Sequence, residues 1–419
     1  MNDSKDSLKT GEASRTPSPV SKQRITPISY VKPFLLGSKN DKNLFFDQIN
    51  DRFGSETACI PVGRARSGLY LMTKFAVRSG RKKVILSPHT IADVVGMVTL
   101  AGGQPVFADF YKNSTSMDLN QINELVDDQT ACVIVTHYHV NQPEMASMRQ
   151  ICQERGAYFF DDCAISFGGD IEGRPIGLQS DGSIFSFSAF KFMNFFWGGL
   201  ITTQDEKFRT FLDEELQTWP SLRALDYIPT IKACLKYDLL TQPVIFRMFT
   251  NVILQRRAKK LGRAETLEHI RKESTYLDQT LTATPHFAAY YEWSRKMPLF
   301  DKARERRRMI AHIYLKFFRK EMVSAEVTNE NIAGSCFTNF PIAMPPGKSA
   351  GIFHEMVLSG FDVGRSLYPN LHENKMFSDV PGYSRNVGEL TRNSIYLPTH
   401  FGVSEEYATE IAKKLKRLI

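Results

Sequence analysis

Apolar and polar segments alternate regularly between about residue 56 and residue 205 of the chain. Short apolar runs rich in β-branched and aromatic side chains are typical of buried strands. Between them, apolar residues recur every three or four positions, which predicts amphipathic helices. The predicted strands are 84–86, 105–108, 132–135, 158–161, 184–187 and 200–203, and the predicted helices are 91–101, 119–126 and 145–155.

Strands that are apolar on both faces and separated by helices indicate a mostly parallel sheet with helices on either side. The fold class is therefore α/β. In such sheets a ligand binds at the carboxyl ends of the strands, so polar residues that directly follow a predicted strand are candidate site residues.

The rest of the chain has a different pattern. Residues 206–320 are helical and rich in charge, and residues 321–419 resemble a small α+β domain with strands at 337–343 and 394–397. Ser404, followed by two acids, predicts the N-cap of a last helix. We expect a disordered tail at 1–24, a large domain at 25–265, and a helical connection with a small C-terminal domain at 266–419.

Composition narrows the class of protein. The 419 residues are 42% hydrophobic, with no apolar run near the roughly 18 residues that span a bilayer, and the first 24 residues lack a signal-peptide pattern. The six cysteines form no C-x-x-C pair. This usage favours reduced thiols and a cytoplasmic protein over a disulfide framework, and it predicts no metal site.

The net charge is +8, with basic clusters at 256–260, 304–308 and 413–417. Such clusters are typical of solvated helix faces; an anionic substrate or an anionic membrane surface are the alternatives. Nothing resembles a nucleic-acid module. Residues 243–263 predict an amphipathic helix with Pro243 at its first position. This helix either packs on its own protein, or contacts a membrane surface or covers a lipid-like substrate.

Two polar residues at strand ends suggest a particular chemistry. Asp162 ends the predicted strand 158–161, and Lys191 follows the predicted strand 184–187. A lysine can bind pyridoxal phosphate covalently, and an aspartate can keep the nitrogen of its pyridine ring protonated. The pair therefore predicts a pyridoxal-phosphate site at the carboxyl edge of the sheet.

The order of motifs around this pair resembles the DegT-type (DegT/DnrJ/StrS) sugar aminotransferases, a branch of the fold-type-I pyridoxal-phosphate transferases. The most specific stretch, 160–203, contains D-D-C-A-I-S-F-G-G-D, then S-D-G-S-I-F-S-F-S-A-F-K, then W-G-G-L-I-T-T. The family pattern has E-D-A-A-Q-A-x-G, then G-D-x-x-x-x-S-F-H-x-x-K, then E-G-G-x-x-x-T. The resemblance covers residues 60–205 well and 335–419 moderately.

The resemblance implies roles for individual residues. Lys191 aligns with the lysine that binds the cofactor, Asp162 with the partner of the ring nitrogen, and Ser186 with a phosphate-binding serine. Asp161 takes the place of the family's glutamate, with a lesser role. The alternatives are a surface lysine at 191 and a turn-capping acidic pair at 161–162.

Three further positions also align with family motifs. Ala65, Arg66 and Ser67 open a predicted helix where the family binds the phosphate, although a plain helix start with surface arginines would look the same. His89 stands where the family stacks an aromatic ring on the cofactor. His372 stands near the family's substrate segment, although a histidine in a surface loop is the alternative.

The chain departs from the family pattern at Ile165, Ser188 and Trp197, and it has no clear counterpart of the G-Y-N-x-R segment through which the family contacts its partner subunit. The resemblance nevertheless implies a homodimeric aminotransferase that moves an amino group from glutamate to a keto group of a nucleotide-linked sugar. The alternatives are a non-nucleotide or lipid-linked ketone, a sugar dehydratase, and a regulatory protein that keeps the fold. Dehydratases of the family carry histidine in place of the lysine, so Lys191 speaks against that class.

Overall fold

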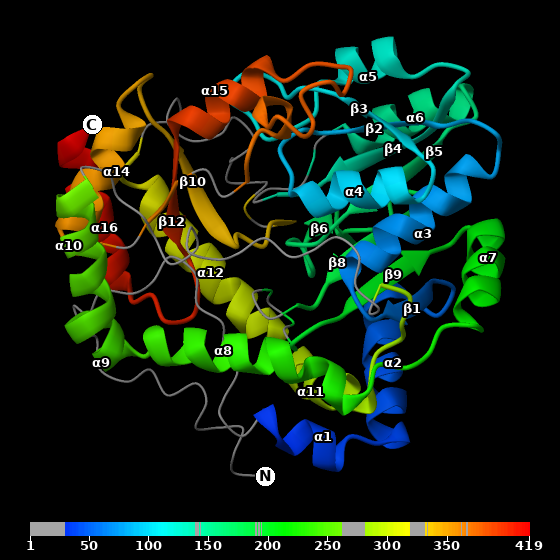
Figure 1. Ribbon diagram of the computed structural model, residues 1–419, viewed down its shortest axis with the longest axis horizontal. Coiled ribbons are helices and arrows are strands. Elements are labelled where there is room, and N and C mark those ends of the chain that lie inside the picture. The colour runs from blue at the N-terminus through cyan, green and yellow to red at the C-terminus, as the bar shows by residue number, and fades with distance from the viewer. Residues whose placement is uncertain are drawn as a thin grey trace.

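The computed structural model describes residues 30–138, 142, 144–188, 191, 193, 195–261, 281–318, 332, 334–361, 363–365 and 368–419. The expected tail at 1–24 lies outside these residues. Figure 1 shows a large lobe around a central sheet and a smaller lobe, with several helices running between them. Among the described residues no helix is long and apolar enough to cross a membrane.

The large lobe contains a seven-stranded sheet in the order β1-β9-β8-β5-β4-β2-β3. Neighbouring strands from β3 to β8 are parallel, whereas β9 is antiparallel to both β8 and β1. The strands are β1 (Ala58–Val62), β2 (Lys83–Leu86), β3 (Gln104–Phe107), β4 (Thr130–Thr136), β5 (Tyr158–Asp162), β8 (Gly182–Ser186) and β9 (Gly199–Thr203). The mostly parallel sheet and all six predicted strands are confirmed, but the sequence did not predict β1 or the reversed β9.

Helices cover both faces of this sheet, as expected for apolar strands. One face packs against α3 (Ala65–Val77), α4 (Ala92–Leu100) and α7 (Glu206–Leu216). The other packs against α5 (Leu119–Leu125) and α6 (Met145–Glu154). Neighbouring residues of β5 serve opposite faces, because Phe160 belongs to the first cluster and Phe159 to the second. This alternation decides where the two aspartates that follow them point.

An aromatic cluster completes the large lobe beside β1 and β9. It joins α1 (Lys32–Leu36), α2 (Lys39–Phe53) and α11 (Phe287–Lys296) to residues 195–197, and Trp293 at its centre is fully buried. The short helix η6 (Met297–Leu299) and α12 (Phe300–Leu315) then lead into the small lobe.

The small lobe is the predicted α+β unit. Its antiparallel sheet has the order β10-β12-β11, formed by β10 (Asn339–Ala343), β11 (Gly364–Arg365) and β12 (Ser394–Pro398). Helices α12, α14 (Ser349–Leu358) and α16 (Glu405–Leu418) pack around it, with α15 (Arg385–Asn393) beside them. The Ser404 hydroxyl accepts a hydrogen bond from the Tyr407 N–H at 3.1 Å, which confirms the predicted N-cap of α16.

The middle of the chain passes between the lobes. It comprises η3 (Ala224–Tyr227), α8 (Ile228–Leu240), α9 (Pro243–Ile245), a π-helical turn η4 (Phe246–Thr250) and α10 (Asn251–Leu261). The helix predicted from Pro243 is confirmed up to residue 261. Ala258 of α10 packs in the small-lobe core, whereas Ala289 of α11 packs in the large lobe. The chain therefore crosses between the two cores more than once, and the predicted boundary at 265 stays a prediction. A hairpin β6 (Asp170–Ile171) and β7 (Arg174–Pro175) and the turn η8 (Leu371–Glu373) complete the fold.

Candidate active site

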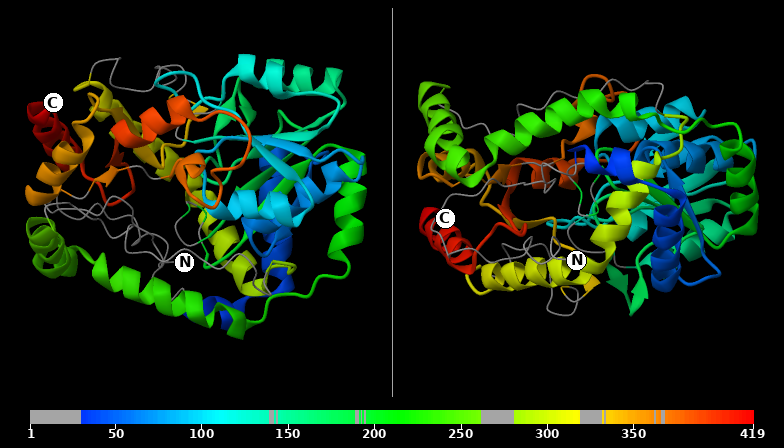
Figure 2. Two further views of the ribbon diagram at one scale, coloured as in Figure 1. Left: turned by 45° about the horizontal axis from the view of Figure 1, so that its top comes forward. Right: turned by 90° about the horizontal axis from the view of Figure 1, so that it is seen from below.

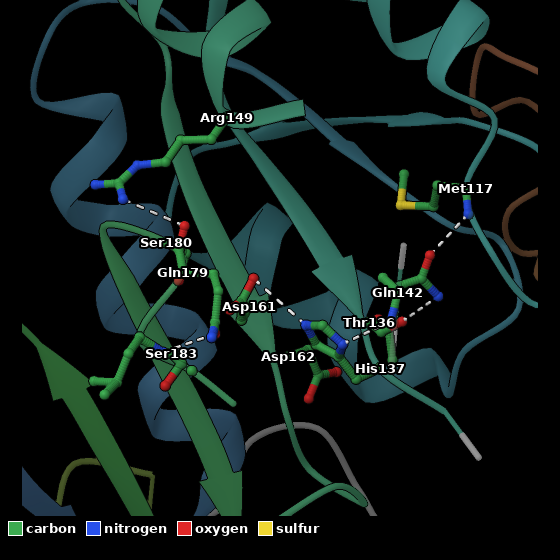
Figure 3. A network of polar contacts seen from close by, with 12 residues as sticks. Met117, Thr136, His137, Gln142, Arg149, Asp161, Asp162, Gln179, Ser180 and Ser183 are labelled. Carbon is green, nitrogen blue, oxygen red and sulfur yellow. Dashed lines mark hydrogen bonds and ion pairs between the residues drawn. The ribbon is translucent and has the colours of Figure 1, made fainter. Parts of the chain in front are cut away.

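The candidate site begins at the carboxyl end of β5, where two consecutive aspartates diverge. Asp162 is 4% exposed, and its Oδ1 accepts a hydrogen bond from the Ala164 N–H at 3.0 Å. Asp161 is fully buried, and its Oδ1 lies 3.7 Å from Nε2 of His137. Figure 3 shows the contact between Asp161 and His137 beside Asp162. Because strand residues alternate between faces, the two carboxyl groups have different surroundings although they are neighbours in the chain.

Lys191 lies after β8, the strand next to β5. Burial raises the pKa of Asp162, while the hydrogen bond from Ala164 and the positive charge of Lys191 act in the opposite direction. The lysine is therefore close enough to the carboxyl group to influence its ionisation. The structure brings these two predicted site residues together, at the edge of the sheet where parallel strands end.

A pocket adjoins Lys191 and is closed on one side by the small lobe. Ser186, at the end of β8, shares this pocket with Lys191, and its hydroxyl is 3.3 Å from that of Ser188. The remaining lining residues are Ala164, Ile165, Phe167, Phe300, Arg304, Arg307, Cys336 and Thr338. The pocket thus combines the loop after β5, the end of β8, helix α12 and the approach to β10.

Two of these lining residues were missed from the sequence. The cluster 304–308 was interpreted as a solvated helix face, and this is wrong for Arg304 and Arg307. Arg304 donates to the Gly168 carbonyl at 2.7 Å and pairs with Asp170 at 2.8 Å. Arg307 donates to the carbonyls of Phe337 and Thr338, and burial lowers its pKa to about 10. The spacing of basic residues along a helix does not reveal which of its turns the other lobe covers. The sequence therefore could not distinguish Arg304 and Arg307 from exposed arginines.

The predicted phosphate-binding segment opens α3 beside β9. A Cβ atom on Gly199 would lie 2.9 Å from the Ala65 Cα, so glycine is required for this close approach. The Ser67 hydroxyl donates to the Leu281 carbonyl at 2.6 Å, and Arg66 pairs with Asp93 at 3.2 Å. These side chains have partners within the protein. The backbone N–H groups of the first helical turn, which point along the helix axis, are therefore the part of this segment best suited to a phosphate.

The two predicted histidines lie at different distances from β5. His89 follows β2, is 1% exposed, and packs with ring centroids 5.2 Å from Tyr138 and 5.6 Å from Tyr368. His372 instead packs 5.4 Å from Phe107 of β3, and its Nδ1 lies 3.0 Å from the Ser384 hydroxyl. Since β3 is four strand spacings from β8, about 19 Å at 4.8 Å each, the structure does not bring His372 to Lys191 within one chain. Both roles stay predictions.

His137 also went unnoticed in the sequence, although it directly follows β4. The Gln142 N–H donates to its Nδ1 at 3.1 Å, so Nδ1 carries the lone pair and Nε2 carries the hydrogen. His137, Asp161 and the buried Cys163 lie within 4.8 Å of one another, an arrangement seen at metal sites. An Nε2 that carries hydrogen cannot be a metal ligand, so the geometry favours an N–H directed at the Asp161 carboxylate.

The donor set fits pyridoxal phosphate. Asp162 offers a buried carboxylate for the ring nitrogen, Lys191 offers an amine for the aldehyde carbon, and Ser186 with the start of α3 offers donors for the phosphate. These residues come from three separate chain segments, the end of β5, the end of β8 with the residues after it, and the start of α3. His89 lies on the flank of this edge, two strands from β5.

Comparisons with known proteins concern the family and the fold. Residues 34–214 match the model of the DegT/DnrJ/EryC1/StrS aminotransferase family. An uncharacterised protein of Methanocaldococcus jannaschii is 26% identical over 40% of this chain and 43% of its own length. The GDP-perosamine synthase of Vibrio cholerae is 26% identical over 37% of this chain and 44% of its own length. The chain thus spans less than half the length of the curated relatives it matches.

Solved structures resemble the whole chain. PseC of Helicobacter pylori, an aminotransferase of pseudoaminic acid biosynthesis, has a TM-score of 0.69 at 16% identity and covers 96% of this chain and 99% of its own. The sugar aminotransferase CalS13 of Micromonospora echinospora has a TM-score of 0.70 at 14% identity and covers 95% of this chain and 99% of its own. At these identities the likeness establishes the fold.

The fold is that of the solved aminotransferase structures, with a mostly parallel α/β sheet and a smaller α+β lobe. Residues 34–214, less than half of the chain, match the model of the DegT/DnrJ/EryC1/StrS aminotransferase family, and over this segment the chain is similar to that family. The cofactor of this family is pyridoxal phosphate, as expected from the residues around Lys191.

Proposed function

We propose that this protein is a pyridoxal-phosphate-dependent aminotransferase that moves an amino group from glutamate to a keto group of a nucleotide-linked sugar. The observation that carries the proposal is the meeting of Lys191 and Asp162 at the carboxyl edge of the sheet. The family match and the two sugar aminotransferases among its structural relatives support the substrate class.

When bound, the cofactor supplies an electron-accepting ring. Asp162 would hold a proton on the ring nitrogen, and its burial keeps that contact away from competing water. Lys191 would bind the cofactor, and its freed amine would move a proton between the carbon that bears the amino group and the cofactor. The pocket beside Lys191 would exclude water through Ile165, Phe167 and Phe300.

The charge of the pocket wall supports an anionic substrate. Two arginines, Arg304 and Arg307, line the pocket, and Arg307 also donates to the backbone carbonyls of Phe337 and Thr338. Arg304 is largely compensated by Asp170 and Asp301. A carboxylate of the amino donor or a phosphate of the acceptor would therefore find a favourable field next to Lys191.

The test is an amination assay with the full chain loaded with pyridoxal phosphate. Glutamate is added as the donor, nucleotide-linked keto sugars are offered in one reaction, and lipid extracts are offered in another. We expect an amino sugar and an equal amount of 2-oxoglutarate in the first reaction only. Aminated product only with the lipid extract would overturn the sugar assignment, and product formed equally well by Lys191→Ala would overturn the enzyme assignment.

We also propose a homodimer in the cytoplasm. The exposed side chains of Leu35 and Leu36 on α1, and of Val31 directly before it, support the dimer, because a second copy could cover this apolar surface. The free state of all six cysteines supports a reducing compartment. A sedimentation mass of 47.7 kDa, that of one chain, at concentrations where the enzyme is active would contradict the dimer. The expected peripheral membrane contact of residues 243–263 belongs to the same set of proposals.

A further inference from the structure

Helix α8 and the segment from η4 to α10 expose an unusual number of large apolar side chains. Seven of them are between 40% and 60% exposed. They are Ile228, Leu235, Leu239, Met248, Phe249, Ile253 and Leu261, and together with the basic residues of 228–261 they form what we call the apolar-basic face. Single exposed apolar residues are common on proteins, but a clustered set of this size marks an interaction surface.

Helix α8 is amphipathic, but its apolar side faces outward and not towards the protein core. Ile228, Leu235 and Leu239 are spaced by seven and four residues and therefore lie on one side of the helix, which faces outward. The inward side carries Cys234, the single fully buried residue of the helix, and Asp238, which accepts a hydrogen bond from Tyr30. A helix that packs only on its own protein would bury its leucines instead.

The segment from η4 to α10 repeats this arrangement. Its inward side, which includes Leu254 and Ala258, packs towards α14 and the small-lobe core. On its outward side Phe249, Ile253, Arg256 and Lys260 follow one another at helical spacing and are all exposed. Apolar residues thus occupy the first turns of the outward stripe and basic residues the last turns.

The charge of this face has one sign. Residues 228–261 contain seven lysines and arginines, all exposed, and a single acid, the half-buried Asp238. The basic residues are Lys232, Lys236, Arg247, Arg256, Arg257, Lys259 and Lys260. Most of the net charge of +8 therefore resides on this one surface. The segment also begins after residue 214, where the family match ends.

We propose that the apolar-basic face docks on an anionic lipid bilayer. Exposed apolar side chains enter the headgroup boundary and neighbouring cations pair with anionic headgroups, which is the pattern of helices that lie in a membrane surface. In the right-hand view of Figure 2, α8 and α10 lie along the same upper side of the molecule, so that one plane can touch both. A second copy of the chain fits the face less well, because two-fold pairing would bring seven cations against seven like charges.

The test is co-sedimentation of the full-length, cofactor-loaded protein with two vesicle preparations. One contains phosphatidylcholine alone, and the other contains phosphatidylcholine with phosphatidylglycerol. We expect binding to the anionic vesicles that weakens as salt is raised. The triple variant Arg256→Gln, Lys259→Gln and Lys260→Gln should bind on the order of 100-fold more weakly, since each cation near an anionic surface contributes about fivefold. Phe249→Ser with Ile253→Ser should also weaken binding, by about tenfold or more.

A matched control separates this surface from net charge. The exposed Lys413, Lys416 and Arg417 end helix α16 just as the basic residues end α10. The triple Gln variant at these positions changes the net charge equally and should leave vesicle binding within about twofold of wild type. Equal loss in both triple variants would overturn the proposal, as would absence of binding to anionic vesicles. A halved sedimentation mass in Phe249→Ser with Ile253→Ser would also overturn it in favour of a second copy.

Discussion

His137 and Asp161 are fully buried, and Nε2 of His137 lies 3.7 Å from Oδ1 of Asp161. Asp161 directly precedes Asp162 on β5, and the positive charge of Lys191 acts on the pKa of Asp162. Neither oxygen of the Asp161 carboxylate accepts a hydrogen bond from the described part of the chain. Two adjacent acids at one strand end therefore have different chemistry. We propose that Asp162 acts on the cofactor, whereas Asp161 is a buried acid with a histidine N–H as its nearest donor.

This difference predicts opposite outcomes for two isosteric changes. Asp162→Asn should fold and bind pyridoxal phosphate but lose most turnover, because an amide cannot hold the ring nitrogen protonated. Asp161→Asn should keep turnover. Its free energy of unfolding should rise by about 1 kcal/mol or more, because the change removes a buried carboxyl group that lacks hydrogen bonds. Turnover and urea unfolding of both variants provide the measurements. Near-normal turnover in Asp162→Asn with an inactive Asp161→Asn would reverse the assignment of the two roles.

Lys191 should be the lysine that carries the cofactor. Borohydride reduction of the loaded protein, followed by peptide mass mapping, should place the adduct on Lys191 and remove the visible absorbance of the bound cofactor. Lys296 is an internal control, because burial lowers its pKa and it pairs with Glu292 at 3.3 Å on helix α11, outside the pocket. Lys296→Ala should keep the adduct and Lys191→Ala should lose it. An adduct on Lys296 would refute the assignment.

Gly199 should be required for the geometry of the α3 start. In Gly199→Ala the new methyl group meets backbone atoms of Arg64 and Ala65 near 3 Å, and backbone cannot move aside as a flexible side chain can. We expect the free energy of unfolding of Gly199→Ala to fall by about 1–3 kcal/mol and its affinity for the cofactor to decrease. Gly351→Ala is the control, since nothing lies within 4 Å of its Cβ in helix α14, and it should stabilise the protein by up to about 1 kcal/mol. If Gly199→Ala binds the cofactor as tightly as the wild type, the start of α3 does not bind the phosphate.

The buried thiols should make the protein sensitive to alkaline pH. Burial raises the pKa of Cys59 and of Cys152 from the usual 9.0 to about 12. In the unfolded chain each thiol loses its proton near pH 9, whereas in the folded protein it keeps the proton. The stability from each thiol is thus fully present below pH 9 and is lost as the pH rises towards 12.

Urea unfolding between pH 8 and pH 11 measures this effect. Each thiol should lower the free energy of unfolding by about 1.4 kcal/mol per pH unit above pH 9. In Cys152→Ala the free energy of unfolding should decrease with pH less steeply, by about 1.4 kcal/mol per pH unit. An identical slope in wild type and variant would show that Cys152 does not contribute.

Much of the fold could be predicted from local pattern. The predicted strands 84–86 and 132–135, which lie within β2 and β4, are apolar at every position, and such runs are stable mainly as buried strands. The direction of β9 was not predictable, because its apolar run is the same whether it enters the sheet parallel or antiparallel. The π-helical turn at 246–250 was missed for a similar reason, since apolar spacing does not distinguish it from an α-helix.

The sequence alone determined the strand ends that carry Asp162 and Lys191, because the buried runs before them set where each strand stops and its side chains become accessible. It also determined the basic, apolar composition of residues 228–261. Only the tertiary structure decided that Arg307 lines the pocket, that His372 packs against Phe107 at the far edge of the sheet, and that Leu235 and Phe249 face outward. These features depend on contacts between segments that are far apart in the chain. A periodic pattern predicts that a helix or strand has an apolar face, but it does not predict what packs against that face.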